Sequence, residues 1–336
     1  MSPDESTKLP IERMRNSTSH SHLLELPPLY GECVASREPD WNLSALVHRK
    51  CPVCGSADPE LICLRPDGLP VATCKICGMT YAVETPSAEN VGGFYRDYHR
   101  FKSYTPRRLP RWRCHLESLL SPYCSILEGT GGIAGFRIGE VGCSYGRLLQ
   151  VLRARGAEVT GIEIDEDALK FLESIGIPAC REVGRRELDV LCAIQLVEHL
   201  VDPASFLETA SQSLHEGGRL LLSLPNAVGL QEVGPAWIGF RVDLEHINYF
   251  TIRTLADLLA MSGLYIEHYW EHGQPGLGEG KSTSAVLIKR GLEALFHSPR
   301  VADGSYVLTV LARKARRGGD ARVVPIQAPS AVTANR

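Results

Sequence analysis

The chain lacks the features of a membrane protein and of a protein that coats nucleic acid. No run of apolar residues in its 336 residues approaches the roughly 18 that a membrane-spanning helix needs. Residues 1–10 are polar and contain no apolar core of the kind found in a secretory signal. The formal net charge is only −3, so no overall field would draw the protein to nucleic acid. We therefore expect a cytoplasmic protein that binds neither membrane nor nucleic acid.

Cysteine is plentiful, with eleven residues, and in a chain without an export signal this favours thiols and metal ligands over disulfides. Four of them form two C-x-x-C pairs, each followed by glycine and separated by 19 residues: Cys51, Cys54, Cys74 and Cys77. Two thiolates on each tight turn can converge on one tetrahedral zinc ion, with Zn–S distances of about 2.3 Å. The spacing is typical of a zinc ribbon. We predict a structural zinc site with these four ligands.

A glycine turn occupies residues 138–146, Ile-Gly-Glu-Val-Gly-Cys-Ser-Tyr-Gly, between an apolar segment and a helical pattern. Glycine lets the backbone approach a ligand closely, and the N–H groups of the following helix face that ligand. A second apolar segment, residues 159–165, carries Glu163 near its end, where a carboxylate can accept hydrogen bonds from a ribose diol. Strand, glycine turn, helix, strand and acid together predict a nucleoside-binding half-sheet.

The charge beside this turn favours one nucleoside cofactor over another. A pyrophosphate-binding turn follows G-x-G-x-x-G, whereas the spacing here is Glu140-x-Gly142-x-Ser144-x-Gly146. An acid at the turn repels pyrophosphate but suits an ammonium group. S-adenosylmethionine carries an ammonium, a sulfonium and a ribose but no phosphate, so the pattern favours it over NAD. A structural glycine turn in an ordinary α/β fold is the alternative.

Residues 137–224 resemble a class I S-adenosylmethionine-dependent methyltransferase. The resemblance rests on the glycine turn, on Glu163, on the Glu198-His199 pair and on the two glycines before the apolar segment 219–224. It implies an α/β, Rossmann-like methyltransferase sheet of seven strands, preceded here by a small zinc-ribbon unit. The residues expected to contact the cofactor are Glu140, Gly142, Cys143, Ser144, Gly146, Glu163, Ile164 and Gln195.

Residues 243–250, Asp-Leu-Glu-His-Ile-Asn-Tyr-Phe, resemble the His-Glu-His-x-x-Tyr-Phe motif of deoxysugar C-methyltransferases. The resemblance implies that His246 is the catalytic base, with Glu245 and Tyr249 alongside. Leu244 stands where the motif has its first histidine, and that family's large C-terminal substrate domain is not found. We therefore expect methyl transfer to a sugar, a glycan or another small molecule, a nucleotide-linked sugar included. A structural role for His246 within its loop is the alternative.

Two other functions compete with this interpretation. Residues 95–113 contain seven Lys or Arg and one acid, interleaved with aromatic residues. Arginine grips phosphates and aromatic rings stack on bases, so an RNA methyltransferase is the second hypothesis. The net charge of −3 argues against it. A binding protein that keeps the fold without turnover is the third.

The sequence divides into regions of different composition. We expect a flexible segment, a zinc ribbon, a bridging helical segment, the methyltransferase domain and a disordered tail at residues 1–48, 49–85, 86–125, 126–315 and 316–336. Within the domain, helices are predicted at 204–214, 251–263 and near 284–296, and strands at 265–270 and 305–312. Cys63 is expected to be a packed thiol, and Cys143 a small core residue rather than a nucleophile.

Overall fold

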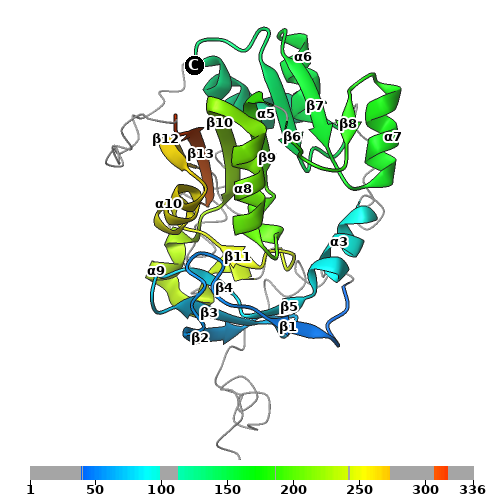
Figure 1. The fold of residues 1–336 in the computed structure, drawn as a ribbon. Helices are drawn as coiled ribbons and strands as arrows, with labels where there is room; N and C mark the ends of the chain where they lie inside the picture. Colours follow the sequence, from blue (N-terminus) through cyan, green and yellow to red (C-terminus); the bar gives the residue numbers. More distant parts are fainter. Residues whose placement is uncertain are drawn as a thin grey trace, which may run out of the picture.

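The computed structural model describes residues 39, 41–98, 113–185, 187–240, 243–272 and 306–316, without the side chains of 113–119, 121, 236 and 238. Most of the predicted flexible segment and tail, the basic stretch 99–112 and the helix near 284–296 lie outside the described residues. The described chain forms a large sheet with helices on both faces and a smaller N-terminal unit at one end of it (Figure 1). Within the described residues, no helix combines the length and the apolar character needed to cross a membrane.

The large sheet has seven strands in the order β12-β13-β10-β9-β6-β7-β8. Their bounds are β6 Arg137–Val141, β7 Glu158–Ile162, β8 Ala179–Cys180, β9 Leu188–Ile194, β10 Leu214–Pro225, β12 Leu264–His272 and β13 Val307–Lys314. Strands β6 to β10 run parallel to one another, and β13 inserts antiparallel between β10 and β12. This confirms the predicted seven-stranded α/β sheet with its final hairpin. The strand order reverses between β6 and β9, which is where open α/β sheets bind ligands.

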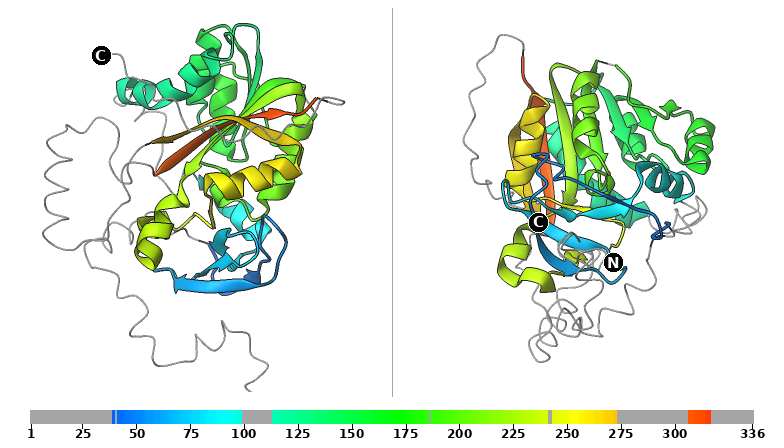
Figure 2. Two further views of the ribbon diagram at one scale, coloured as in Figure 1. Left: turned by 90° about the vertical axis from the view of Figure 1, so that its left-hand side faces the viewer. Right: turned by 60° about the horizontal axis from the view of Figure 1, so that its bottom comes forward.

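Helices cover both faces of this sheet (Figures 1 and 2). One face packs against α5 Arg113–Glu128, α6 Arg147–Ala154 and α7 Glu166–Ser174, and the other against α8 Pro203–Ser213 and α10 Ile252–Met261. Successive residues of β9 alternate between these cores: Val190 and Cys192 face α5, α6 and α7, whereas Leu191 and Ala193 face α8 and α10. Strands buried on both faces are nearly continuously apolar, as β9 is from Val190 to Ile194.

The predicted start of α10 is confirmed by its cap. The hydroxyl of Thr251 accepts a hydrogen bond from the N–H of Thr254, and the Thr254 hydroxyl accepts one from the N–H of Thr251. Gly263 follows the helix with φ 69°, the left-handed conformation that glycine adopts readily. The other helices of the described residues are α3 Ala88–Arg96, α9 Leu230–Val233 and the short 3₁₀ turns η6 Val197–His199, η7 Ala227–Gly229, η8 Gly234–Ala236 and η9 Ile238–Phe240.

The N-terminal unit, hereafter the cysteine unit, consists of residues 46–86. Strands β1 Leu46–His48 and β5 Glu84–Pro86 form an antiparallel pair. A second sheet has the order β11-β4-β3-β2, with β2 Pro59–Leu64, β3 Pro70–Cys74 and β4 Thr80–Ala82. Its edge strand β11, Asn248–Tyr249, comes from the segment between β10 and α10, and Cys51 and Tyr81 share a hydrophobic core with Leu255 of α10. The cysteine unit is therefore built into the domain rather than attached by a linker.

Candidate active site

The glycine turn after β6 has the conformation that its sequence requires. Gly142, Ser144 and Gly146 have φ of 68°, 51° and 62°, all in the left-handed region. A Cβ atom on Gly146 would lie 2.5 Å from Cδ2 of Leu172, so position 146 accepts only glycine without rearrangement. Ser144 keeps the turn, as expected, although its side chain makes this conformation less favourable than it would be for glycine.

Glu163 lies directly after β7 and holds the glycine turn against it. One carboxylate oxygen accepts a hydrogen bond from the Ser144 N–H at 2.7 Å. The other accepts from the N–H groups of Ile164 at 2.7 Å and Asp165 at 3.0 Å. A carboxylate offers about four acceptor positions, so three are used and about one is left for a ligand. In this arrangement Glu163 organises the turn as well as facing the cavity beside it.

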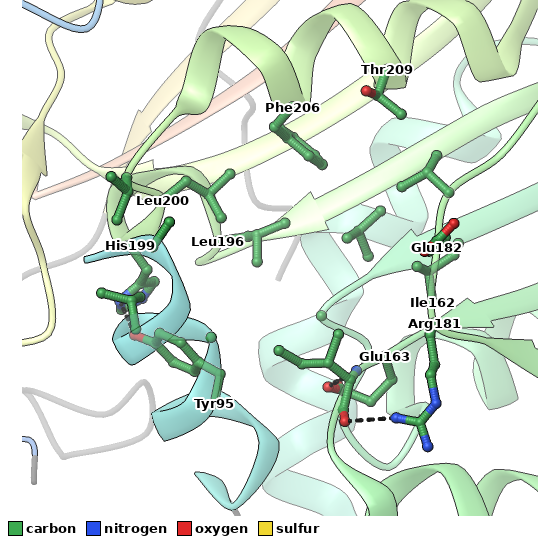
Figure 3. Close-up of a pocket in the computed structure, with 18 of the residues that line it drawn as sticks. Tyr95, Ile162, Glu163, Arg181, Glu182, Leu196, His199, Leu200, Phe206 and Thr209 are labelled. Carbon is green, nitrogen blue, oxygen red and sulfur yellow. Dashed lines mark hydrogen bonds between the residues drawn. The ribbon is translucent and has the colours of Figure 1, made fainter. Parts of the chain in front are cut away.

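A cavity of about 760 Å³ opens beyond the carboxyl ends of β6, β7 and β9, between α3 and α8. Figure 3 shows Glu163 and Arg181 at one end of it and Tyr95 and His199 at the other. Of the residues predicted to contact the cofactor, those that line it are Gly142, Ser144, Glu163, Ile164 and Gln195. Glu140, Cys143 and Gly146 are not among its lining residues.

Glu140 and Cys143 lie beneath the turn rather than on the cavity wall. Glu140 is buried, and its Oε2 atom has no hydrogen-bond partner within the described residues. Burial, reinforced by the neighbouring carboxylate of Glu163, raises the pKa of Glu140 to about 8. Cys143 is also buried, and burial raises the pKa of its thiol, so it is a packed thiol with no nucleophilic character.

The raised pKa of Glu140 makes folding stability depend on pH. The carboxyl has a pKa of 4.5 in its ordinary state and about 8 when folded, so stability is lost as pH rises between these values. Glu140→Gln removes this titration, and the stability of the variant relative to the wild type should rise by about 2–3 kcal/mol between pH 6 and pH 9. Urea unfolding at both pH values measures it. A difference that does not change with pH would contradict the assignment.

Two histidines meet at the end of the cavity away from Glu163. His199, from η6, lines the cavity, and its Nδ1 lies 2.8 Å from the hydroxyl of Tyr95. Its Nε2 lies 3.8 Å from a carboxylate oxygen of Glu198, whose pKa burial raises to about 8. The ring of His246 packs edge-on against His199, with 4.7 Å between the ring centroids. His246 is buried behind His199 and is not a lining residue of the cavity.

Glu245 and Tyr249 lie near His246 but do not line the cavity. A carboxylate oxygen of Glu245 accepts a hydrogen bond from the hydroxyl of Tyr98 at 3.0 Å. The hydroxyl of Tyr249 donates to the backbone carbonyl of His246 at 3.0 Å, and burial raises the pKa of Tyr249 to about 12. The Tyr249 hydroxyl thus points to the backbone of its own loop, in the role of an anchor.

The lining residues Tyr95 and Tyr98 were not predicted as site residues. Tyr95 lies in the last turn of α3, and Tyr98 follows two residues after the end of that helix. Their sequence signal was their place in the basic, aromatic stretch, whose spacing of three puts both rings on one side of a helix. His199 was predicted only as part of a family motif, and the structure makes it the histidine that faces the cavity.

The four predicted zinc ligands converge in the structure. Their sulfur atoms all lie within 4.8 Å of one another, with 3.5 Å between Cys51 and Cys77 and between Cys54 and Cys74. Tetrahedral zinc with 2.3 Å bonds separates its sulfurs by about 3.8 Å, so this cysteine cluster fits the ion. The glycines after each pair, Gly55 and Gly78, have φ of 70° and 78° and close the two turns.

Two further observations concern possible ligands. Cys63 lies outside the cysteine cluster, buried with Trp237 and Phe240, as a packed thiol. Among the described residues, one other group has ligand atoms within 4.8 Å of one another: Glu198, His199 and His246.

Part of the chain is similar to known methyltransferases. Residues 116–269 match the methyltransferase domain family. The ubiquinone biosynthesis O-methyltransferase of Idiomarina loihiensis is 30% identical over 114 residues, which are 30% of this chain and 47% of that protein. The enzyme of the same name from Nitrosomonas europaea is 33% identical over 114 residues, 30% of this chain and 48% of its own. The chain thus spans about half the length of the curated relatives it matches.

Two solved methyltransferase structures are similar to part of the chain, at low sequence identity and with TM-scores below 0.5. The 1,6-didemethyltoxoflavin-N1-methyltransferase of Burkholderia thailandensis has a TM-score of 0.47 and 16% identity, and covers 77% of this chain and 100% of its own. A SAM-dependent methyltransferase from Archaeoglobus fulgidus has a TM-score of 0.41 and 21% identity, and covers 59% of this chain and 93% of its own. Together with the strand order, the family match shows that the chain has the fold of a class I S-adenosylmethionine-dependent methyltransferase.

Proposed function

We propose that the protein transfers the methyl group of S-adenosylmethionine to a small molecule whose attacking atom carries a proton. The observation that supports this is a single cavity of about 760 Å³ with a carboxylate at one end and histidine at the other. This volume is within the range of small-molecule sites, roughly 300–1,000 Å³. The cofactor would occupy the end at Glu163, and the acceptor would meet its sulfonium near His199.

The cofactor end has the groups that a nucleoside with an amino-acid tail needs. Glu163 has an acceptor position left for a ribose hydroxyl, and Ile164 lies beside it on the cavity wall. Apolar residues such as Leu196 and Phe206 line the cavity between its two ends and exclude water from a planar base (Figure 3). Glu140, which lies beneath the glycine turn, would supply negative potential to the methionine end of the cofactor when its carboxyl group is ionised.

The histidine end is suited to proton removal. Methyl transfer is an in-line displacement at an already activated sulfonium, so the enzyme chiefly positions the acceptor and removes its proton. Histidine titrates near neutral pH and can accept that proton. We assign the contact with the acceptor to His199, because it lines the cavity, and an orienting role to His246, whose ring packs against it. The prediction from the motif, that His246 is itself the base, is tested by comparing variants of the two histidines.

Two observations bear on the chemical class of the methyl acceptor, and they differ in how specific they are. The relatives found are named for ubiquinone biosynthesis and O-methylation, which favours a small hydroxylated acceptor. A sugar, a glycan or a nucleotide-linked sugar rests on the resemblance of residues 243–250 alone. The same proposal includes one structural zinc ion on the cysteine cluster, because its four sulfurs fit that ion.

Methyl transfer can be tested without knowing the acceptor. Purified protein is incubated with methyl-labelled S-adenosylmethionine and a cell extract separated into small-molecule, RNA and protein fractions. Label should enter the small-molecule fraction and be lost with His199→Asn. Label in RNA would support the second hypothesis instead. Cofactor binding without transfer to any fraction would support a binding protein and contradict the proposal.

Glu163→Ala should weaken the binding of S-adenosylmethionine by about 10- to 100-fold, because a charge-assisted hydrogen bond contributes roughly 1.5–3 kcal/mol. The loss of the Ser144 contact acts in the same direction, since the turn is no longer held. Calorimetry on both proteins measures the affinity. Glu182→Ala is the matched control, because Glu182 lines the same cavity but is exposed. Equal affinities for Glu163→Ala and the wild type would mean that the ribose is held elsewhere.

A further inference from the structure

The loop that carries His246 is held by the cysteine unit. Strand β11 pairs with β4, with Asn248 opposite Tyr81 and Tyr249 opposite Thr80. The N–H of Ala82 adds a hydrogen bond to the carbonyl of Ile247 at 3.0 Å. Residues 243–250, here called the His246 loop, therefore form the edge of a sheet whose other strands come from residues 59–82.

A buried arginine of the cysteine unit grips this loop near both ends. The guanidinium of Arg65, directly after β2, is fully buried and donates to the carbonyls of Leu244 and His246. The same group lies 2.8 Å from the hydroxyl of Tyr249 and forms an ion pair with Asp67. Desolvation alone would lower the pKa of this guanidinium, but Tyr249 and Asp67 outweigh it and raise the pKa, so the charge is kept. A planar fork of five donors can hold these acceptors at once, and an ammonium cannot.

A second buried arginine links the His246 loop to the segment that carries His199. Arg49 donates to the carbonyls of Ile247 at 3.3 Å and Val201 at 2.9 Å, and to the side-chain oxygen of Asn248 at 2.8 Å. The amide nitrogen of Asn248 in turn donates to the carbonyl of Leu200 at 2.7 Å. The backbone N–H of Ile247 donates to the carbonyl of Glu198 at 2.9 Å. These contacts hold the backbone just before His199, at Glu198, and just after it, at Leu200 and Val201.

We propose that Arg49 and Arg65 are positioning residues that hold the backbones of His199 and His246 against the cavity. The cysteine unit would then be part of the active-site framework, and its metal content would govern turnover through these two arginines. The inference rests on the proposed methyl transfer for its kinetic consequence. Its structural consequence, the order of the His246 loop, does not depend on any acceptor.

Three variants test the proposal. Arg65→Gln combined with Asp67→Asn removes the grip without leaving the buried Asp67 charge unpaired. Arg49→Lys keeps the charge but cannot reach all of the acceptors of the guanidinium, which also donates to the carbonyl of Ala82 at 3.3 Å. Arg219→Gln is the matched control, because Arg219 is a partly buried arginine that pairs with Glu267 at 2.7 Å, on β10 and outside the cavity lining.

Two measurements are made on each full-length variant. The first is hydrogen exchange of the backbone amides, where the two test variants should exchange about 10- to 100-fold faster in residues 197–201 and 244–249, with β9 and β10 unchanged. The second is steady-state kinetics with calorimetric cofactor binding. Displacing the histidines should lower kcat by about 10- to 100-fold while the cofactor Kd and the acceptor KM stay within about twofold. The control should match the wild type in both.

The outcomes separate this inference from the proposed function. Unchanged exchange in both segments, or normal kcat in both test variants, would overturn the positioning role. Faster exchange throughout β9 and β10 would overturn it as well, because the arginines would then support the whole fold. If the wild type transfers methyl to no acceptor, the proposed function fails, and the exchange data still decide whether the arginines order the loop.

Discussion

His199→Asn should lower turnover by about 10²- to 10⁴-fold, the usual contribution of a general base, while cofactor affinity changes little. Asparagine is close to histidine in size and polarity but cannot take up a proton near neutral pH. His199 faces the cavity and bonds to Tyr95, so the base is lost while the wall is kept. The loss should grow with the pKa of the acceptor group, because a base matters most for a proton that leaves reluctantly.

The companion variant His246→Asn decides between the two histidines. If His246 only orients His199, its replacement should lower turnover less than that of His199. If His246 is the base, as the motif implies, its variant should show the full loss and His199→Asn the smaller one. Single-turnover kinetics at saturating cofactor measure both. His215→Asn serves as the control, because His215 is a partly exposed histidine that pairs with Asp189 and does not line the cavity. Normal turnover in both test variants would remove the two histidines from the mechanism.

Most of the fold could be predicted from patterns of residues that lie close together in the sequence. The glycine turn, the acid after β7 and the capped helix α10 all depend on residues a few positions apart, and each is found where it was predicted. The two cysteine pairs are another local pattern, and the hairpin of β2 and β3, which sets Pro59 opposite Cys74, brings them together. Such features are legible because turn chemistry and hydrophobic periodicity act over short distances along the chain.

What could not be predicted depends on contacts between distant parts of the chain. Nothing in residues 248–249 indicates that they pair with β4, about 170 residues earlier, because a two-residue strand has no periodicity to detect. That His199 lines the cavity while His246 lies buried behind it depends on that pairing. The three backbone hydrogen bonds of Glu163 also depend on how the glycine turn folds back on β7. A sequence motif can therefore predict that Glu163 binds a ligand, but not how many of its acceptor positions stay available for that ligand.

Cys74→Ser should abolish zinc binding and unfold the cysteine unit while the seven-stranded sheet persists. Structural zinc contributes about 10–16 kcal/mol of apparent binding free energy in zinc-finger peptides, so its loss exceeds what a small unit can retain. Cys74 is the last residue of β3, and β3 pairs with both β2 and β4. The effect should therefore reach β11 and with it the His246 loop, so turnover is lost as well as metal.

Elemental analysis and hydrogen exchange measure this result together. The wild type should contain one zinc per chain and the variant none, with exchange accelerated in residues 46–86 and 243–250 and not in β9. Cys180→Ser is the matched control, because Cys180 is a partly buried cysteine of β8, outside the cysteine cluster. A wild type without zinc would contradict the site, and two ions would mean that Glu198, His199 and His246 also hold metal. In that last case the histidines would act as metal ligands, and His199 could not accept the proton in the proposed transfer.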